Sequence, residues 1–158
     1  MTIENNLIEN LAKKWESENR LVVKELMVPI VNQIYYDNYL EEREYIRIDL
    51  AAYDEKSDQI IFVEAENGLY LQHPQIYLPF CNLLYVLCPE EKSSFRNEQI
   101  KWSLDQGIGI IEQSNEGELI ESLTPLFRKM YPAVQAYVKS RLFKRLEKER
   151  RRNVKIII

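Results

Sequence analysis

The chain has 158 residues, of which 46% are hydrophobic and 29% charged, and this balance is typical of one folded domain. One His and two Cys exclude a two-His zinc motif, a four-Cys zinc site and a disulfide framework, and four Gly cannot form either common Gly-rich phosphate-binding loop. Because 25 residues are Asp or Glu, the chemistry that remains is that of carboxylates.

The first part of the chain predicts a helix followed by three strands. Apolar residues spaced four apart over 3–16 form one stripe of a helix, and residues 21–28 predict a strand. The Tyr-rich, acidic segment 30–44 is compatible with an extended strand pair or with a loop. Residues 45–53 and 59–66 predict two strands, and the turn composition between them indicates a β-hairpin.

The second part predicts helices alternating with strands. In chain order these are a helix over 69–80, a strand covered on both faces over 83–88, a helix over 95–106, a strand over 108–112, and helices over 117–130 and 132–152. The whole order predicts an α/β fold with a mixed central sheet flanked by helices. We expect an α/β core over 1–130, with a basic C-terminal helix and tail over 131–158 packed on or extending from the same domain.

The net charge of −4 is distributed unevenly. Residues 139–155 contain nine Lys or Arg and two Glu, so the rest of the chain is strongly acidic. Such a basic helix end can lie along a phosphate backbone or can simply be a solvated helix whose cations complement the helix dipole. The candidate nucleic-acid-binding residues are Lys144, Arg145, Lys148, Arg150, Arg151 and Arg152. The final run Ile156–Ile158 is compatible with an added strand or with a partner contact. Assembly as a homodimer is a separate expectation.

The hairpin brings acidic residues together. If the loop spans 55–58, Asp54 pairs with Gln59, and Asp49 then falls opposite Glu64. Any loop with an even number of residues keeps Asp49, Glu64 and Glu66 on one face of the sheet. The opposite face is predicted to hold Ile48, Leu50, Ala52, Ile61, Val63 and Ala65.

Three carboxylates this close repel each other, so they must share a proton or surround a cation. Oxygen ligands of this kind suit Mg²⁺ or Mn²⁺, which keep several waters and bind phosphate oxygens. The alternative is a solvent-exposed acidic stripe on an edge hairpin.

The unit Asp49-x14-Glu64-Ala65-Glu66, on two strands followed by a helix and a buried strand, resembles the PD-(D/E)XK nuclease superfamily. The segments 47–50, 62–66, 77–86 and 107–111 are similar to DNA repair endonucleases of the MmcB type, so the resemblance covers about residues 3–112. It implies a restriction-endonuclease-like core and metal-dependent hydrolysis of phosphodiester bonds in DNA.

The resemblance also implies residue roles. Asp49, Glu64 and the backbone carbonyl of Ala65 would hold Mg²⁺ or Mn²⁺, and position 66 would carry a Lys that helps to activate water. Here that position is Glu66, as in some active restriction enzymes of the superfamily, so the site is either a working variant or a degenerate one. Lys24 on the preceding strand is a candidate replacement for the missing cation. Supporting roles would fall to Glu9, His73, Gln75 and Tyr77.

The sequence therefore predicts a metal-dependent DNA endonuclease or a nuclease-like DNA repair protein. The alternatives are a catalytically silent nucleic-acid-binding module of the same fold and a protein–protein adaptor. The N-terminal residues have no apolar core like that of a signal peptide, and no apolar run approaches the roughly 20 residues needed to span a bilayer. We therefore expect a cytoplasmic protein without a membrane partner.

Overall fold

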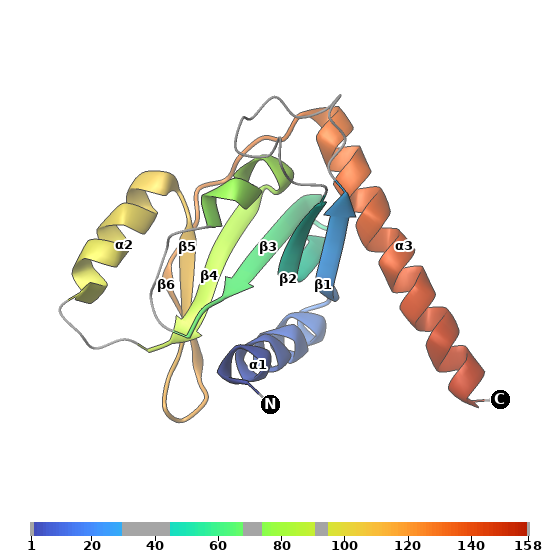
Figure 1. Cartoon of the computed structure of the whole chain (residues 1–158), viewed down its shortest axis with the longest axis horizontal. Helices are drawn as coiled ribbons and strands as arrows, with labels where there is room; N and C mark the ends of the chain where they lie inside the picture. Colours follow the sequence, from blue (N-terminus) through green and yellow to red (C-terminus); the bar gives the residue numbers. More distant parts are fainter. Residues whose placement is uncertain (1, 30–44, 68–73, 91–94, 158) are drawn as a thin grey trace.

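The structure is a computed structural model that describes residues 2–29, 45–67, 74–90 and 95–157, with side chains to residue 152. The predictions for segment 30–44 and for His73 lie outside these residues. The described residues form ten elements, and their arrangement is drawn in Figure 1. They are α1 (Ile3–Ser17), β1 (Leu21–Pro29), β2 (Tyr45–Asp54), β3 (Gln59–Ala65), η2 (Pro74–Phe80), β4 (Leu83–Pro89), α2 (Phe95–Gln106), β5 (Gly109–Gln113), β6 (Leu119–Leu123) and α3 (Pro132–Ile157).

The strands form one six-stranded sheet in the order β1-β2-β3-β4-β5-β6. Neighbours are antiparallel from β1 to β3, parallel from β3 to β5, and antiparallel again between β5 and β6. The predicted α/β fold with a mixed sheet and flanking helices is thus confirmed. Helix α1 covers one face of the sheet, and η2 and α3 contribute to the core on the other face (Figure 1).

The β2–β3 hairpin has the predicted register. Asp54 pairs with Gln59, and the pairing continues to Leu50 opposite Val63. Both strands are almost fully buried along this stretch. The hairpin does not lie at an edge of the sheet, because β1 pairs with β2 and β4 pairs with β3. The alternative of an acidic stripe on an edge hairpin therefore does not apply.

The helix predicted over 117–130 is wrong. Residues 119–123 form strand β6, which pairs with β5, and residues 124–130 have no regular structure. Gly117, with φ of +85°, and Ser114, whose N–H bonds to the Glu118 carbonyl, close the turn that returns the chain to β5. Pairing with an open sheet edge outweighs the weak helical preference of this segment.

The helix predicted over 69–80 is corrected to a shorter 3₁₀ helix. Only η2 is helical among the described residues of that range, and it contains Pro79 in its interior. A proline has no N–H to donate and clashes with the preceding turn, so a continuous α-helix cannot pass through this position.

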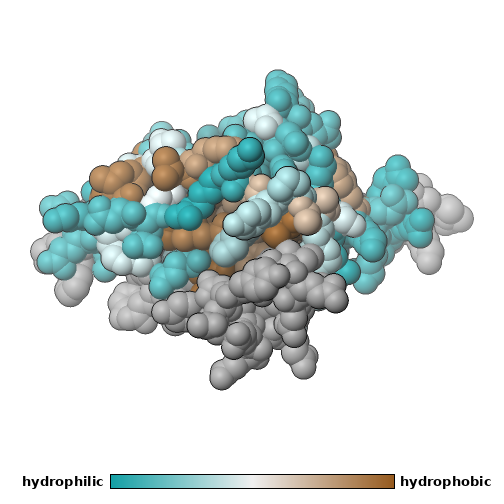
Figure 2. All heavy atoms as spheres, turned by 90° about the horizontal axis from the view of Figure 1, so that it is seen from above, coloured by the Kyte–Doolittle hydropathy of each residue, from teal (hydrophilic) through white to brown (hydrophobic). Residues whose placement is uncertain are grey.

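Helix α3 runs along the β1 edge of the sheet, and its C-terminal end extends beyond it (Figure 1). Val134, Val138 and Leu142 are buried against the sheet, and the Tyr137 hydroxyl donates to the Pro29 carbonyl at 2.8 Å. The extending end is hydrophilic on the face seen in Figure 2. Across the described residues, no helix combines the length and apolar character needed to cross a membrane.

Gly109, at the start of β5, is expected to tolerate no side chain. An added Cβ would lie 2.7 Å from Pro125 Cδ, 2.8 Å from Tyr85 Cδ1 and 2.9 Å from the Leu123 carbonyl oxygen. Gly109→Ala should therefore lower the unfolding free energy by about 2–3 kcal/mol through overpacking, measured by urea denaturation. In Gly117→Ala nothing lies within 4 Å of the new Cβ, so its positive φ alone should cost about 1 kcal/mol. Equal losses in the two variants would contradict the packing explanation.

Candidate active site

The side chains of Asp49 and Glu64 accept backbone hydrogen bonds at the point where the regular pairing of β2 and β3 ends. Beyond Leu50 and Val63, the Asp49 N–H donates to Glu64 Oε1 at 3.3 Å, and the Ala65 N–H donates to Asp49 Oδ2 at 2.9 Å. Each acid thus accepts a hydrogen bond from the backbone of the opposite strand. The predicted opposition of Asp49 and Glu64 is confirmed.

Burial changes the protonation of this pair. Loss of solvent raises the pKa of Glu64 to about 8, and the charges of Asp49 and Glu66 add to this shift. Burial also raises the pKa of Asp49, against the opposing effects of the Ala65 N–H and the Arg47 charge. Glu64 therefore holds a proton at neutral pH, as expected for acids that must share a proton or bind a cation.

A cavity of about 300 Å³ opens next to Asp49, between α1, the β1–β2 edge and α3. Its lining residues come from four elements. They are Glu4, Asn5, Ile8 and Glu9 of α1, Lys24 and Glu25 of β1, Arg47 and Asp49 of β2, and Arg145 of α3. The cavity thus joins acidic and basic side chains that lie far apart in the sequence.

The charges in the cavity are paired with one another. Lys24 forms an ion pair with Glu9, which lowers the pKa of the Glu9 carboxyl. Arg47 Nη2 lies 2.5 Å from Glu25 Oε1, and Arg145 Nη1 donates to the Glu25 carbonyl at 3.2 Å. Glu9, predicted as a supporting residue, and Lys24, predicted as a candidate replacement for the missing cation, therefore lie together beside Asp49.

The regular alternation of β1 and β2 breaks at this point. Glu25 has a φ of +52°, a rare backbone conformation for a non-glycine residue, and it lies between the pairs that flank Asp49. Ile48 packs in the core on the α3 side, whereas Leu50 and Ala52 pack against α1. The prediction that these three residues share one face is therefore wrong, because the alternation of β2 changes at Asp49, opposite the left-handed Glu25.

Of the remaining predicted site residues, Tyr77 contacts the acid pair, whereas Gln75 lies on the surface. Tyr77, buried in η2, forms a side-chain hydrogen bond with Glu64 that opposes the rise in its pKa. Glu66 follows the end of β3, and its N–H donates to the Leu87 carbonyl at 2.8 Å. Gln75 is exposed. The contributions of Glu25 and Arg145 to the cavity were missed, since only the tertiary fold brings α3 to β1.

The donor chemistry fits an oxygen-preferring divalent cation. Two partly buried carboxylates and the Ala65 backbone oxygen are ligands of the kind that Mg²⁺ and Mn²⁺ take with several waters. A cation bound there would offset the charge of Asp49, which adds to the effect of burial in raising the pKa of Glu64. Within the described parts of the chain, no three His, Cys, Asp or Glu side chains are grouped as a metal site.

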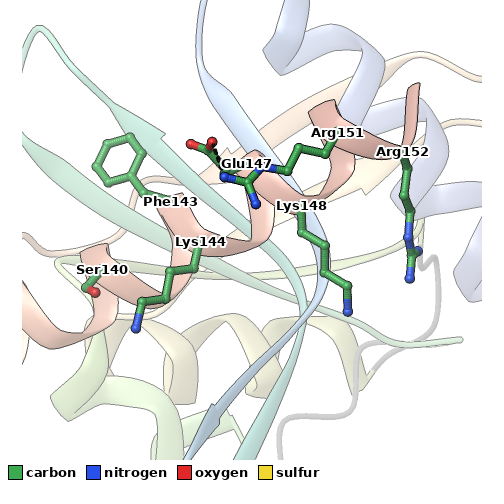
Figure 3. Close-up of a pocket in the computed structure, with 7 residues that line it drawn as sticks. All are labelled: Ser140, Phe143, Lys144, Glu147, Lys148, Arg151 and Arg152. Carbon is green, nitrogen blue, oxygen red and sulfur yellow. Dashed lines mark ion pairs between the residues drawn. The ribbon is translucent and has the colours of Figure 1, made fainter. Parts of the chain in front are cut away.

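The predicted nucleic-acid-binding residues lie on α3. A cleft of about 700 Å³ is lined, among the described residues, by Ser140, Phe143, Lys144, Glu147, Lys148, Arg151 and Arg152 (Figure 3). Glu147 pairs with Arg150 and Arg151, at 3.7 and 3.3 Å. In Figure 3, Lys144, Lys148 and Arg152 point to one side of the helix.

No protein-family model and no curated protein matches the chain. Among solved structures, the chain is similar to a protein of unknown function from Silicibacter pomeroyi. The similarity covers 94% of this chain and 89% of that one, with a TM-score of 0.67 and 14% sequence identity. At this identity the similarity establishes the fold alone.

Proposed function

We propose that the protein is a metal-dependent deoxyribonuclease of the PD-(D/E)XK type, which hydrolyses phosphodiester bonds with Asp49 and Glu64 as the acidic centre. The observation that carries this proposal is the reciprocal hydrogen bonding of these two carboxylates across the parting strands, with Glu64 at a pKa of about 8. A partly buried acid pair in which one pKa is strongly raised is a common mark of a functional site.

The proposed reaction divides the chemistry among the neighbouring residues. A divalent cation held by Asp49, Glu64 and the Ala65 carbonyl would neutralise charge on the phosphodiester and lower the pKa of a water ligand. Glu66 would accept a proton from the attacking water as the water oxygen bonds to phosphorus. The bond from phosphorus to the leaving sugar oxygen would break, and that oxygen would take a proton from solvent. Lys24, in the same cavity as Asp49, supplies positive charge in place of the usual family Lys.

The second candidate is a catalytically silent DNA-binding module of the same fold. Glu66 favours it, because this position carries an acid where the resembled superfamily has Lys. Both candidates share DNA as the partner, and the basic face of α3 supports this choice. They differ only in whether the acid pair does chemistry.

A cleavage assay separates the two candidates. The purified chain is incubated with labelled linear, branched and single-stranded DNA in Mg²⁺, Mn²⁺ or EDTA, beside Glu66→Lys. We expect wild type to cut in Mn²⁺ or Mg²⁺ and not in EDTA, and Glu66→Lys to cut no faster, because Glu66 already serves as proton acceptor. An inactive wild type with an active Glu66→Lys variant would identify a decayed nuclease. Inactivity of both proteins would favour the silent module.

A further inference from the structure

Three cationic side chains from three different elements reach the cavity next to Asp49. Lys24 comes from β1, Arg47 from β2 and Arg145 from α3. Their side chains are 43%, 55% and 34% exposed, so solvent and solutes can reach all three. Cations that converge on a solvent-filled cavity from separate elements can bind an anion larger than one carboxylate.

The present partners of these cations are groups that an anion can replace. Lys24 pairs with the Glu9 carboxylate, Arg47 with the Glu25 carboxylate and Arg145 with the Glu149 carboxylate. Exposed ion pairs of this kind add little to stability because solvent screens them. A phosphate can therefore take the place of the Glu25 carboxylate at Arg47 without unfolding the site.

The basic face of α3 continues from this cavity. Lys148 and Arg152 follow Arg145 by three and seven positions, so the three side chains share one face of the helix. The helical rise spreads them over about 10 Å. Lys148 and Arg152 are exposed, and among the described residues neither forms an ion pair with a carboxylate. In Figure 3 both point to the same side of α3.

We propose that the cavity and the α3 face bearing Arg145, Lys148 and Arg152 form one continuous binding site for a nucleic-acid phosphodiester backbone, which leads from the end of α3 to Asp49 and Glu64. Arg145 is the link, because it belongs to the helix face and also reaches the Glu25 backbone in the cavity. The inference deepens the proposed function and rests on it for the kind of ligand.

Binding without cleavage tests this site directly. Fluorescence anisotropy in EDTA measures the affinity of the full chain for labelled single-stranded DNA, blunt duplex and duplex with a single-stranded tail, over a series of salt concentrations. Lys148→Ala/Arg152→Ala should weaken binding at least about tenfold. Each lost phosphate contact should reduce the slope of log affinity against log salt concentration by about 0.9 for duplex DNA and about 0.7 for single strands. The size of the change therefore identifies whether duplex or single-stranded DNA binds along α3.

A matched control removes the same charge elsewhere. Lys101 on α2 and Lys129 before α3 are exposed and lie outside the cavity lining and the proposed α3 face. Lys101→Ala/Lys129→Ala should change the affinity less than twofold.

Glu25→Gln should tighten binding severalfold, because it removes the carboxylate that competes for Arg47, and a merely structural role of Glu25 would not produce this gain. Thermal melting of each variant confirms that it is folded.

The outcomes separate this inference from the proposed reaction. Equal losses in the two double variants, or no binding by wild type, would overturn the shared site. The expected binding pattern together with no cleavage in Mn²⁺ would support the site while rejecting hydrolysis. Cleavage in Mn²⁺ that survives Lys148→Ala/Arg152→Ala with unchanged affinity would support the nuclease and overturn the α3 site.

Discussion

Asp49→Asn is expected to slow metal-dependent cleavage strongly while leaving the fold intact. Loss of the Asp49 carboxylate, which stabilises charge in the proposed transition state, should reduce the cleavage rate roughly 100- to 1,000-fold. The Asn side-chain oxygen can still accept the Ala65 N–H, which now donates to Asp49 Oδ2 at 2.9 Å. Because burial raises the pKa of Asp49, its removal relieves an unfavourable charge. The melting temperature should therefore stay unchanged or rise.

The measurement combines a single-turnover cleavage rate in Mn²⁺ with a thermal melt of the same protein preparation. Asp105→Asn, at an exposed position on α2, is the matched control and should retain wild-type rates. If Asp49→Asn cleaved DNA at the wild-type rate, the reaction would have to take place somewhere other than the β2–β3 acid pair.

The second large effect is a dependence of stability on pH that comes from Glu64. Its pKa is about 8 in the folded chain against an ordinary value of 4.5. Between these pH values the folded protein binds more protons than the unfolded protein, so its unfolding free energy falls as the pH rises. From pH 5 to pH 9 without divalent cations, the loss attributable to Glu64 should be about 2–4 kcal/mol.

Glu64→Gln isolates this contribution, because Gln cannot ionise and its oxygen can still accept the Asp49 N–H. The variant should lose less stability than wild type over the same pH range, as measured by urea unfolding at each pH. In wild type, Mn²⁺ should raise the melting temperature more at pH 8.5 than at pH 6, since the cation competes with the proton on Glu64. If the unfolding free energies of the two proteins fell equally with pH, a raised pKa of Glu64 would be contradicted.

The sequence alone determined the features that depend on local pattern. The β2–β3 register follows from the parity of the 55–58 turn, and this register places Asp49 opposite Glu64. The amphipathic stripe of α1 and the apolar run of β4 likewise carried enough information to fix their structure. Side-chain period and turn length are properties of a few adjacent residues, so they can be read from the chain directly.

Tertiary structure decided what depends on distant partners. Residues 119–123 became a strand because the edge of β5 was open to pairing, and no local signal marks that edge. Glu25 adopts a positive φ opposite Asp49, at the point where Ile48 and Leu50 pack on opposite faces of the sheet. Above all, the packing of α3 on β1 brought Arg145 into the cavity of Asp49. Burial of α3 residues in the core fixed that contact, and burial is a property of the whole fold.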